Sequence, residues 1–520
     1  MVQVIPVGFR GARTAAGPLT LGQLNVAKWL ADAPDAPAAR LEQRLPVPPG
    51  TTLAAVVAAL GALVSRHEGL RSRYTLGDPG SQQVLDSGSV PLAVYAELPA
   101  DLGPVSASEP VRFAVALAQG ALTAVYSHIA VDFQALMVLE GEFDTLIRGR
   151  ELADVVLQPL DRAEAERAPA RRRRQEQALR HWFRHVEAAP AHLYARPRID
   201  PAAGSGACGM SSEAAARALD RIAARTRTSR PTIVLAAWCA LLARRTGYDI
   251  CRFVMLSANR FESGLSEFVG TLAQSTFVAV DTAGAAFDEL IRRTFGAVLQ
   301  AGVNGAYHVY RQDEGTLSRM TERGLAPSFE PLFNSVIVDT RGFDAPVADS
   351  DPAPTDLLWV DMPPTNILLR FDLGRADDVL VARVWTGDTG RVSPAEAREL
   401  LLALERLLVA AALNDLEPGA VMEALAVGVI ERPAGWHLVD GCWVDLAEVQ
   451  RLLDDALGAG VARLADGPEL TAALLDASLS PAEARRRCLS LLPGRHAAMV
   501  PRAFVLGGDP AGTRWNAEGA

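Results

Sequence analysis

The sequence predicts a protein of the α/β class with more than one domain. Segments of β-prone apolar residues alternate with segments of helical apolar spacing along the chain, and such alternation indicates layers of sheet and helix. Apolar residues make up 49% of the chain and charged residues 22%, which is the balance of a globular protein with a large core. Because 520 residues exceed what one ordinary core holds, we expect about three domains.

The first third of the chain carries clear helix and hairpin patterns. Helices are predicted over residues 53–67 and 133–148, and strands over residues 111–118 and 121–126. Between the two strands stands Gln119-Gly120, which predicts a two-residue hairpin turn. Residues 127–132 therefore fall on a strand-to-helix loop, where side chains can be presented into a cleft.

The later part of the chain continues the alternation. A stretch rich in Pro, Gly and Ser around residues 197–205 predicts a loop or linker. Helices are predicted over residues 212–225, 232–245, 287–300 and 394–413. Strands are predicted over residues 252–256, 276–280, 333–339, 367–373 and 379–385. From residue 421 onward the pattern predicts a separate small α/β unit.

Composition narrows the functional classes. The net charge of −10 disfavours nucleic acid as a partner. Five widely spaced cysteines without a CxxC pair argue against disulfides and zinc and favour free thiols in a reducing cytosol. The first residues resemble no signal peptide, and the apolar run over residues 233–243 is too short to span a bilayer. We therefore expect a cytoplasmic protein without a membrane partner.

The segment SHIAVDF, residues 127–133, holds the most informative chemistry. An acyl-transfer site needs a group that orients and deprotonates an amine or alcohol, and histidine suits that task near neutral pH. A carboxylate four residues after His128, at Asp132, can pair with an arginine and fix the loop. The alternative is a core histidine followed by a surface aspartate.

Other segments place this one in a larger pattern. In chain order they are GPLTLGQ at 17–23 running on to Trp29, RHEGLRSRY at 66–74, the helix 231–247, Asn259-Arg260 with VGTLAQS at 269–275, and PLFN at 331–334. Together with SHIAVDF they resemble the ordered motifs of the condensation domains of nonribosomal peptide synthetases, over roughly residues 15–415.

The resemblance implies two lobes shaped like chloramphenicol acetyltransferase around a central tunnel. Carrier proteins from other chains would bring phosphopantetheine arms bearing an acyl thioester donor and an amine or hydroxyl acceptor, and the protein itself would need no metal or bound cofactor. His128 would be the catalytic histidine, and Asp132 would hold the loop through an arginine, either Arg66 or Arg71. Tunnel-lining positions would be Phe133, Gln274, Ser275 and Asn334.

Three positions depart from the family pattern. Ser127 replaces the first histidine of the motif, Phe133 replaces its final glycine, and Gln274 replaces an asparagine. A glycine permits close substrate approach and strained backbone angles, so Phe133 could narrow the tunnel or tilt the loop. Three hypotheses follow: a trans-acting condensation enzyme, a catalytically silent domain that recruits carriers or tailoring enzymes, and an acyltransferase for an untethered acceptor.

The last hundred residues carry a second resemblance. VDGCWVDLAEV at 439–449, LTAAL at 470–474 and MVPRAFVL at 499–506 resemble the small C-terminal subdomain of adenylation domains. The lysine that completes such active sites corresponds to about Asn516 here, so the resemblance implies a remnant used for docking or stability. The predicted domains are residues 1–175, 176–415 and 421–520.

Two further clusters have simpler interpretations. Arg171–Arg174 could steer an acidic carrier protein, although a solvated helix face is the favoured interpretation. His181 and His185 stand at i, i+4 spacing and could bind a metal, but a surface or packed pair is favoured because no third ligand is close in sequence.

Overall fold

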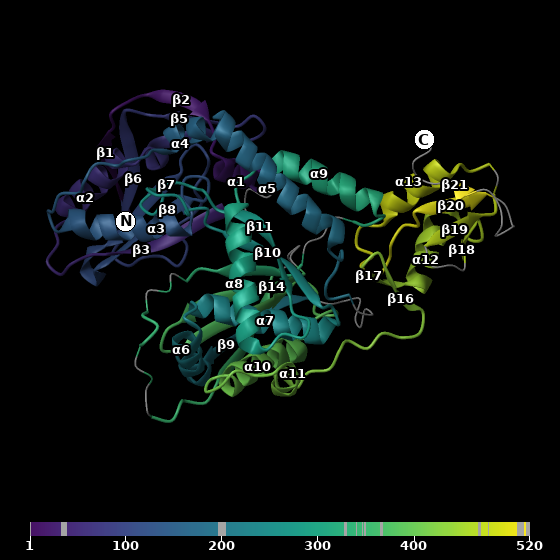
Figure 1. The fold of residues 1–520 in the computed structure, drawn as a ribbon. Helices are drawn as coiled ribbons and strands as arrows, with labels where there is room; N and C mark the ends of the chain where they lie inside the picture. Colours follow the sequence, from purple (N-terminus) through teal and green to yellow (C-terminus); the bar gives the residue numbers. More distant parts are fainter. Residues whose placement is uncertain are drawn as a thin grey trace. The chain divides into compact units, whose positions relative to one another are not determined.

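The computed structural model describes residues 2–32, 39–195, 204–326, 330–337, 339, 341–345, 347, 350–363, 368–465, 470–476, 478–506 and 514–515. Helices and sheets alternate along the chain (Figure 1), so the predicted α/β class is confirmed. The chain forms two compact units. The first comprises Met1–Arg180, Ser257–Ser275 and Gly302–Gln312, and the second comprises His181–Leu256, Thr276–Ala301 and Asp313–Ala520.

The first unit contains a five-stranded sheet of order β1-β6-β7-β8-β3. All neighbours in it are antiparallel except β6 and β7. Its strands are β1 (Gln3–Arg10), β6 (Ser87–Val94), β7 (Val111–Ala116), β8 (Ala121–Ser127) and β3 (Arg40–Pro46). A second sheet, of order β2-β5-β4, has the strands β2 (Ala15–Pro18), β5 (Ser81–Val84) and β4 (Ser72–Thr75). The helices are α1 (Leu21–Asp32), α2 (Leu53–Arg66), α3 (Phe133–Ile147), α4 (Pro159–Glu166) and the first part of α5 (Pro169–Ala188).

Strand β8 leads into the loop of residues 127–132, which contains His128, and it is an inner strand of the five-stranded sheet. It pairs with β7 on one side and β3 on the other, which explains its nearly continuous buried run. The predicted two-residue turn before it is wrong. The link is one turn of 3₁₀ helix, Leu117–Gln119, closed by Gly120 at φ 60°, a left-handed conformation that glycine adopts without steric cost.

The second unit contains a seven-stranded sheet of order β11-β10-β12-β14-β15-β9-β13. Its strands are β9 (Ser205–Ser212), β10 (Ile250–Ser257), β11 (Gln274–Asp281), β12 (Leu332–Ser335), β13 (Asp356–Met362), β14 (Leu369–Ala376) and β15 (Leu380–Thr386). Its helices include α6 (Glu213–Thr226), α7 (Arg230–Thr246), α10 (Pro394–Ala410) and α11 (Pro418–Leu425), together with the greater part of α8 (Phe287–Val303) and of α9 (Val309–Glu322). The apolar run within α7 is buried, as the sequence predicts.

Three sequence predictions in this unit fall partly on residues outside the described ranges, and one of them is the strand 367–373, whose first residue is not described. Most of the predicted linker 197–205 lies outside them, and its last residue, Ser205, begins β9. The predicted strand 333–339 is shorter than expected, since β12 ends at Ser335. Strand β9 escapes sequence analysis because its segment SGACGMSS is composed of small residues without an apolar alternation.

The C-terminal segment from residue 421 onward also belongs to the second unit. After α11 it forms the hairpin β16 (Trp436–Val439) and β17 (Cys442–Asp445), then α12 (Leu446–Leu457), β18 (Ala462–Ala465), β19 (Thr471–Leu474), α13 (Pro481–Leu491), β20 (Ala503–Leu506) and β21 (Arg514–Trp515). Strands β18 to β21 form one sheet in chain order. The three predicted domain ranges stay predictions, and Asn516 lies outside the described residues.

Arg323 fastens this C-terminal segment to the rest of the second unit. Its buried guanidinium donates to the backbone carbonyl oxygens of Val186 at 2.8 Å and Ala189 at 2.7 Å. It also donates to the carboxylate and the carbonyl of Asp440, each at 2.8 Å. The next residue, Gly324, accepts a hydrogen bond from the Val500 amide at 2.9 Å. One arginine therefore holds α5 and the β16–β17 turn together.

Replacing Arg323 with alanine is expected to destabilise the second unit by about 3 kcal/mol, because the buried carbonyl oxygens of Val186 and Ala189 lose this charged donor. Thermal unfolding and limited proteolysis around residues 426–435 would measure the effect. The matched control is Arg451→Ala, which removes an exposed arginine paired with Glu448 in the same segment. Equal unfolding temperatures for the two variants would show that Arg323 does not anchor the segment.

No helix within the described ranges has both the length and the apolar character needed to cross a membrane. All five cysteines are free and buried.

Candidate functional site

The histidine loop, residues 127–132, leaves the end of β8 and leads into α3. Its backbone is fixed from three directions. The His128 amide donates to the carbonyl of Ala39 at 2.9 Å, and the Ala130 amide donates to the carbonyl of Ser127 at 2.9 Å. The hydroxyl of Thr271 donates to the His128 carbonyl at 2.6 Å. The loop is therefore held in one conformation before any substrate binds.

The His128 ring is oriented by a single hydrogen bond. Its Nδ1 lies 3.0 Å from the carbonyl oxygen of Val131. A carbonyl can only accept, so Nδ1 carries a proton, and in the neutral ring the lone pair is on Nε2. Within the part of the chain that the structure describes, Nε2 makes no hydrogen bond. The ring is half-buried and meets the Trp29 ring edge-on, with 5.8 Å between centroids. His128 thus presents a basic nitrogen in a fixed direction.

Asp132 stabilises the loop at its junction with α3, where it is the N-cap residue. Its carboxylate caps α3 by accepting from the Ala135 amide at 3.0 Å. It forms a two-pronged ion pair with Arg260, with both N–O distances at 2.7 Å. The Leu272 and Ala273 amides donate to it as well, at 2.9 and 3.3 Å. Both oxygens of the carboxylate are occupied by these donors, so the role of Asp132 is structural.

The arginine partner of Asp132 is Arg260, and the expectation of Arg66 or Arg71 is wrong. Arg66 pairs with Glu142 at 3.0 Å. Burial raises the pKa of Glu142, but His67 and Arg66 outweigh it and hold this pKa below its usual value. Arg71 is buried and donates to backbone carbonyls, including that of Ser65 at 3.3 Å. Arg66 and Arg71 therefore have other partners. Arg260, which is 128 residues from Asp132 in the sequence, is the arginine that pairs with it.

The other predicted site residues have separate places. Ser127 is buried at the end of β8. Phe133 is the first residue of α3 and is 39% exposed. It is not among the described non-glycine residues with positive φ, so its backbone needs no glycine. Asn334 is half-buried on β12, in the second unit.

Gln274 and Ser275 both hold Tyr307. The Gln274 side-chain amide donates to the Tyr307 carbonyl at 2.9 Å and accepts from its amide at 3.4 Å. The Tyr307 hydroxyl donates to the Ser275 carbonyl at 2.7 Å. Gln274 is buried, so this residue positions the segment around Tyr307. That Phe133, Gln274, Ser275 and Asn334 line a tunnel stays a prediction.

His181 and His185 form a packed pair, in line with the favoured interpretation. Nε2 of His181 lies 2.9 Å from the Phe277 carbonyl, and the His185 ring stacks on the Phe277 ring at 5.6 Å. Burial, with a smaller effect of His181, lowers the pKa of His185 to about 4. Among the described residues, no three His, Cys, Asp or Glu side chains gather as metal ligands do.

Two residues near the start of α1 support the site and were missed as such by sequence analysis. The Thr20 hydroxyl donates to the Thr271 carbonyl at 3.1 Å. Gly22 packs so closely that a Cβ there would lie 2.4 Å from the Thr271 oxygen and 2.5 Å from the Leu272 Cα. Both belong to the GPLTLGQ motif. The motif therefore packs against the segment that contains Thr271, and the Thr271 hydroxyl donates to the His128 carbonyl.

Gly22→Ala is expected to destabilise the protein by about 1–3 kcal/mol, because the added methyl group meets backbone that cannot rotate away. Gly141→Ala on α3 is the matched control, since a Cβ at Gly141 meets nothing within 4 Å. The control should gain about 0.5–1 kcal/mol from its improved helix propensity. Urea unfolding of both variants measures the difference, and effects of the same sign would contradict the close approach.

Comparison with known proteins identifies the fold. No protein-family model and no curated protein matches the chain. Several solved structures do. One is a condensation domain that mediates chain release from the enacyloxin polyketide synthase, with 21% identity and a TM-score of 0.58 over 78% of this chain and 84% of that one.

Two further structures extend the comparison. The first condensation domain of the CDA synthetase has 17% identity and a TM-score of 0.58, over 79% of this chain and 98% of that one. The X-domain from teicoplanin biosynthesis, solved in complex with OxyB, has 21% identity and a TM-score of 0.53, over 77% and 94%. The motif resemblance and these structural matches agree, and the chain therefore has the condensation-domain fold.

Proposed function

We propose that the protein is a condensation enzyme that acts on carrier-bound substrates in natural-product biosynthesis. It joins an acyl or aminoacyl thioester to an amine or hydroxyl acceptor. The observation that carries this proposal is the geometry of His128. Its Nδ1–H is committed to the Val131 carbonyl, so the unprotonated Nε2 is the nitrogen that meets the acceptor.

The chemistry follows from that tautomer. As the acceptor's nitrogen or oxygen attacks the thioester carbonyl, Nε2 takes the proton that the acceptor loses. When the tetrahedral intermediate collapses, the carbon–sulfur bond breaks and the histidine returns the proton to the leaving thiolate. The products are an amide or ester and a free thiol. Most of the rate gain comes from holding two tethered substrates in line.

The carriers are supplied by other chains in this proposal. Acyl or peptidyl carrier proteins present their substrates on phosphopantetheine arms, the protein holds no metal or cofactor of its own, and the reaction takes place in the cytoplasm. The structural matches to condensation domains of a polyketide synthase and of the CDA synthetase support this class of substrate. The C-terminal segment, held by Arg323, serves stability or docking.

One observation favours a second function, a silent domain that recruits carriers or tailoring enzymes. Phe133, an exposed aromatic residue, stands directly after Asp132 where condensation domains carry glycine. One structural match is an X-domain in complex with OxyB. In this alternative Phe133 blocks substrate approach, and the same fold serves only as a binding surface.

The two functions are separated by product formation. Candidate carrier proteins are loaded with acyl thioesters, incubated with the protein and an amine or hydroxyl acceptor, and followed by intact-mass spectrometry. The condensation enzyme is expected to transfer the acyl group and leave a free carrier thiol. An inert wild type whose Phe133→Gly variant gains activity would establish the silent domain instead.

A further inference from the structure

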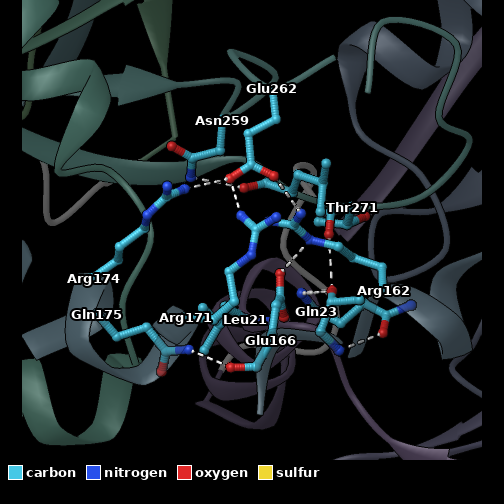
Figure 2. Close-up of polar contacts among 12 residues, drawn as sticks. Leu21, Gln23, Arg162, Glu166, Arg171, Arg174, Gln175, Asn259, Glu262 and Thr271 are labelled. Atoms are coloured by element: carbon cyan, nitrogen blue, oxygen red, sulfur yellow. Dashed lines mark hydrogen bonds and ion pairs between the residues drawn. The ribbon is translucent and has the colours of Figure 1, made fainter. Parts of the chain in front are cut away.

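A cavity of about 330 Å³ lies in the first unit, between the start of α1, the α4–α5 region and the segment after β10. A volume of this size is sufficient for a small ligand. Charged side chains form part of its lining, and Figure 2 shows three arginines converging on a single carboxylate. We call this cavity the arginine pocket. Its charged residues are Arg162, Arg171, Arg174, Glu166 and Glu262.

Glu262 serves three guanidinium groups at once. Arg162 donates to it at 3.0 Å and Arg174 at 3.3 Å, and Arg171 donates to the same oxygen as Arg174 (Figure 2). Arg162 is also paired with the buried Glu166 at 2.8 Å. The pocket thus sets three cations against two carboxylates and keeps an excess of positive charge.

Arg171 and Arg174 retain unused donors. In the described part of the chain each of them donates only to Glu262, through a single nitrogen, although a guanidinium has five N–H groups. Burial, together with the nearby charges of Arg162 and Arg174, lowers the pKa of Arg171. A further anion would relieve this crowding of like charges. The neighbouring Arg173 is exposed and does not line the pocket.

Apolar side chains also line the pocket. They are those of Leu21, Phe261, Val303 and Ala306. Phe261 is 65% exposed and Val303 is 74% exposed, and the ring of Phe261 rests against Gly302, where a Cβ would lie 2.6 Å from it. Exposed apolar side chains beside clustered arginines fit a ligand with a charged head and an apolar tail.

We propose that the arginine pocket binds a small organic anion, a carboxylate or phosphate monoester attached to an apolar group. Arg171 and Arg174 turn from Glu262 toward the anion, because planar guanidinium groups bind carboxylate and phosphate oxygens in pairs. The Glu262 carboxylate competes with the anion for these two arginines and pairs with them when no ligand is bound. This site goes beyond the proposed condensation activity, since none of residues 127–133 lines the pocket.

The test measures binding to the full-length protein by isothermal titration calorimetry at low ionic strength. The probes are hexyl phosphate, hexanoate and inorganic phosphate. Hexyl phosphate or hexanoate is expected to bind, and the tighter of the two identifies the head group. Arg171→Gln and Arg174→Gln should each weaken this binding about tenfold, while Arg173→Gln leaves it unchanged. Glu262→Gln should tighten binding, because it removes the competing carboxylate and leaves the arginines in place.

Three results would overturn the proposal. The first is the absence of saturable binding by either organic probe. The second is equal affinity for inorganic and hexyl phosphate, which would remove the apolar part of the ligand. The third is binding that the Arg171→Gln/Arg174→Gln double variant retains. This double variant keeps the Arg162–Glu262 ion pair, and a thermal-shift measurement shows whether it is folded. The double variant therefore tests the proposal even if Glu262→Gln does not fold.

Discussion

Replacing His128 with alanine is expected to slow condensation by about 10²–10⁴-fold, the usual contribution of a positioned general base. The substrates remain tethered and aligned in the variant, so residual transfer persists. Among the described residues the ring makes one hydrogen bond, to the Val131 carbonyl, while the loop backbone is held by Ala39 and Thr271. The loss is therefore expected in the rate and not in the stability of the protein.

The measurement is a single-turnover time course of acyl transfer followed by intact mass. His437→Ala is the matched control, because His437 is exposed on β16 in the C-terminal segment. Its rate should equal that of the wild type. A His128→Ala variant that transfers the acyl group as fast as the wild type would remove His128 from the mechanism.

Replacing Asp132 with alanine is expected to destabilise the protein by about 3–5 kcal/mol, the range for breaking a buried ion pair from one side. The side chains of Asp132 and Arg260 are 3% and 6% exposed, so the arginine left behind has little access to water. The Ala135, Leu272 and Ala273 amides lose their acceptor at the same time. Because Leu272 and Ala273 directly follow Thr271, whose hydroxyl holds the His128 carbonyl, activity should fall along with stability.

The control for this variant lies on the same helix. Asp144→Ala removes a carboxylate whose pair with Arg148 is exposed, and it should change stability by less than about 1 kcal/mol. The double variant Asp132→Ala/Arg260→Leu should recover part of the loss, because it leaves no buried charge unpaired. Equal unfolding free energies for Asp132→Ala and Asp144→Ala would contradict the structural role of Asp132.

The elements that sequence analysis predicts well are those with strong apolar periodicity. Helices α2, α3 and α7 begin and end within a few residues of the expected positions, because each buries a regular face or is buried throughout. Strand β9 and helix α9 were not predicted, since β9 is made of small residues and α9 (VYRQDEGTLSRMTE) is mostly polar. Their conformations depend on packing partners elsewhere in the chain.

The candidate site divides in the same way. The loop position of His128 follows from the strand before it and the helix after it, and both are readable locally. The partner of Asp132 cannot be predicted from the local sequence, because the chain contains many arginines and only the fold determines which of them lies next to the carboxylate. Asn259-Arg260 was recognised as part of a motif, but only the fold brings Arg260 to the carboxylate.

The ion pair between Asp132 and Arg260 also sets an order of events during synthesis. Until residue 260 has left the ribosome, the carboxylate of Asp132 lacks its arginine partner, so the histidine loop reaches its final structure only after half of the protein has been made. A chain cut after Arg180 would carry the histidine without its support. Anyone exchanging this unit between related proteins must therefore move Ser257–Ser275 and Gly302–Gln312 together with Met1–Arg180, because the unit is encoded by three separated stretches of the gene.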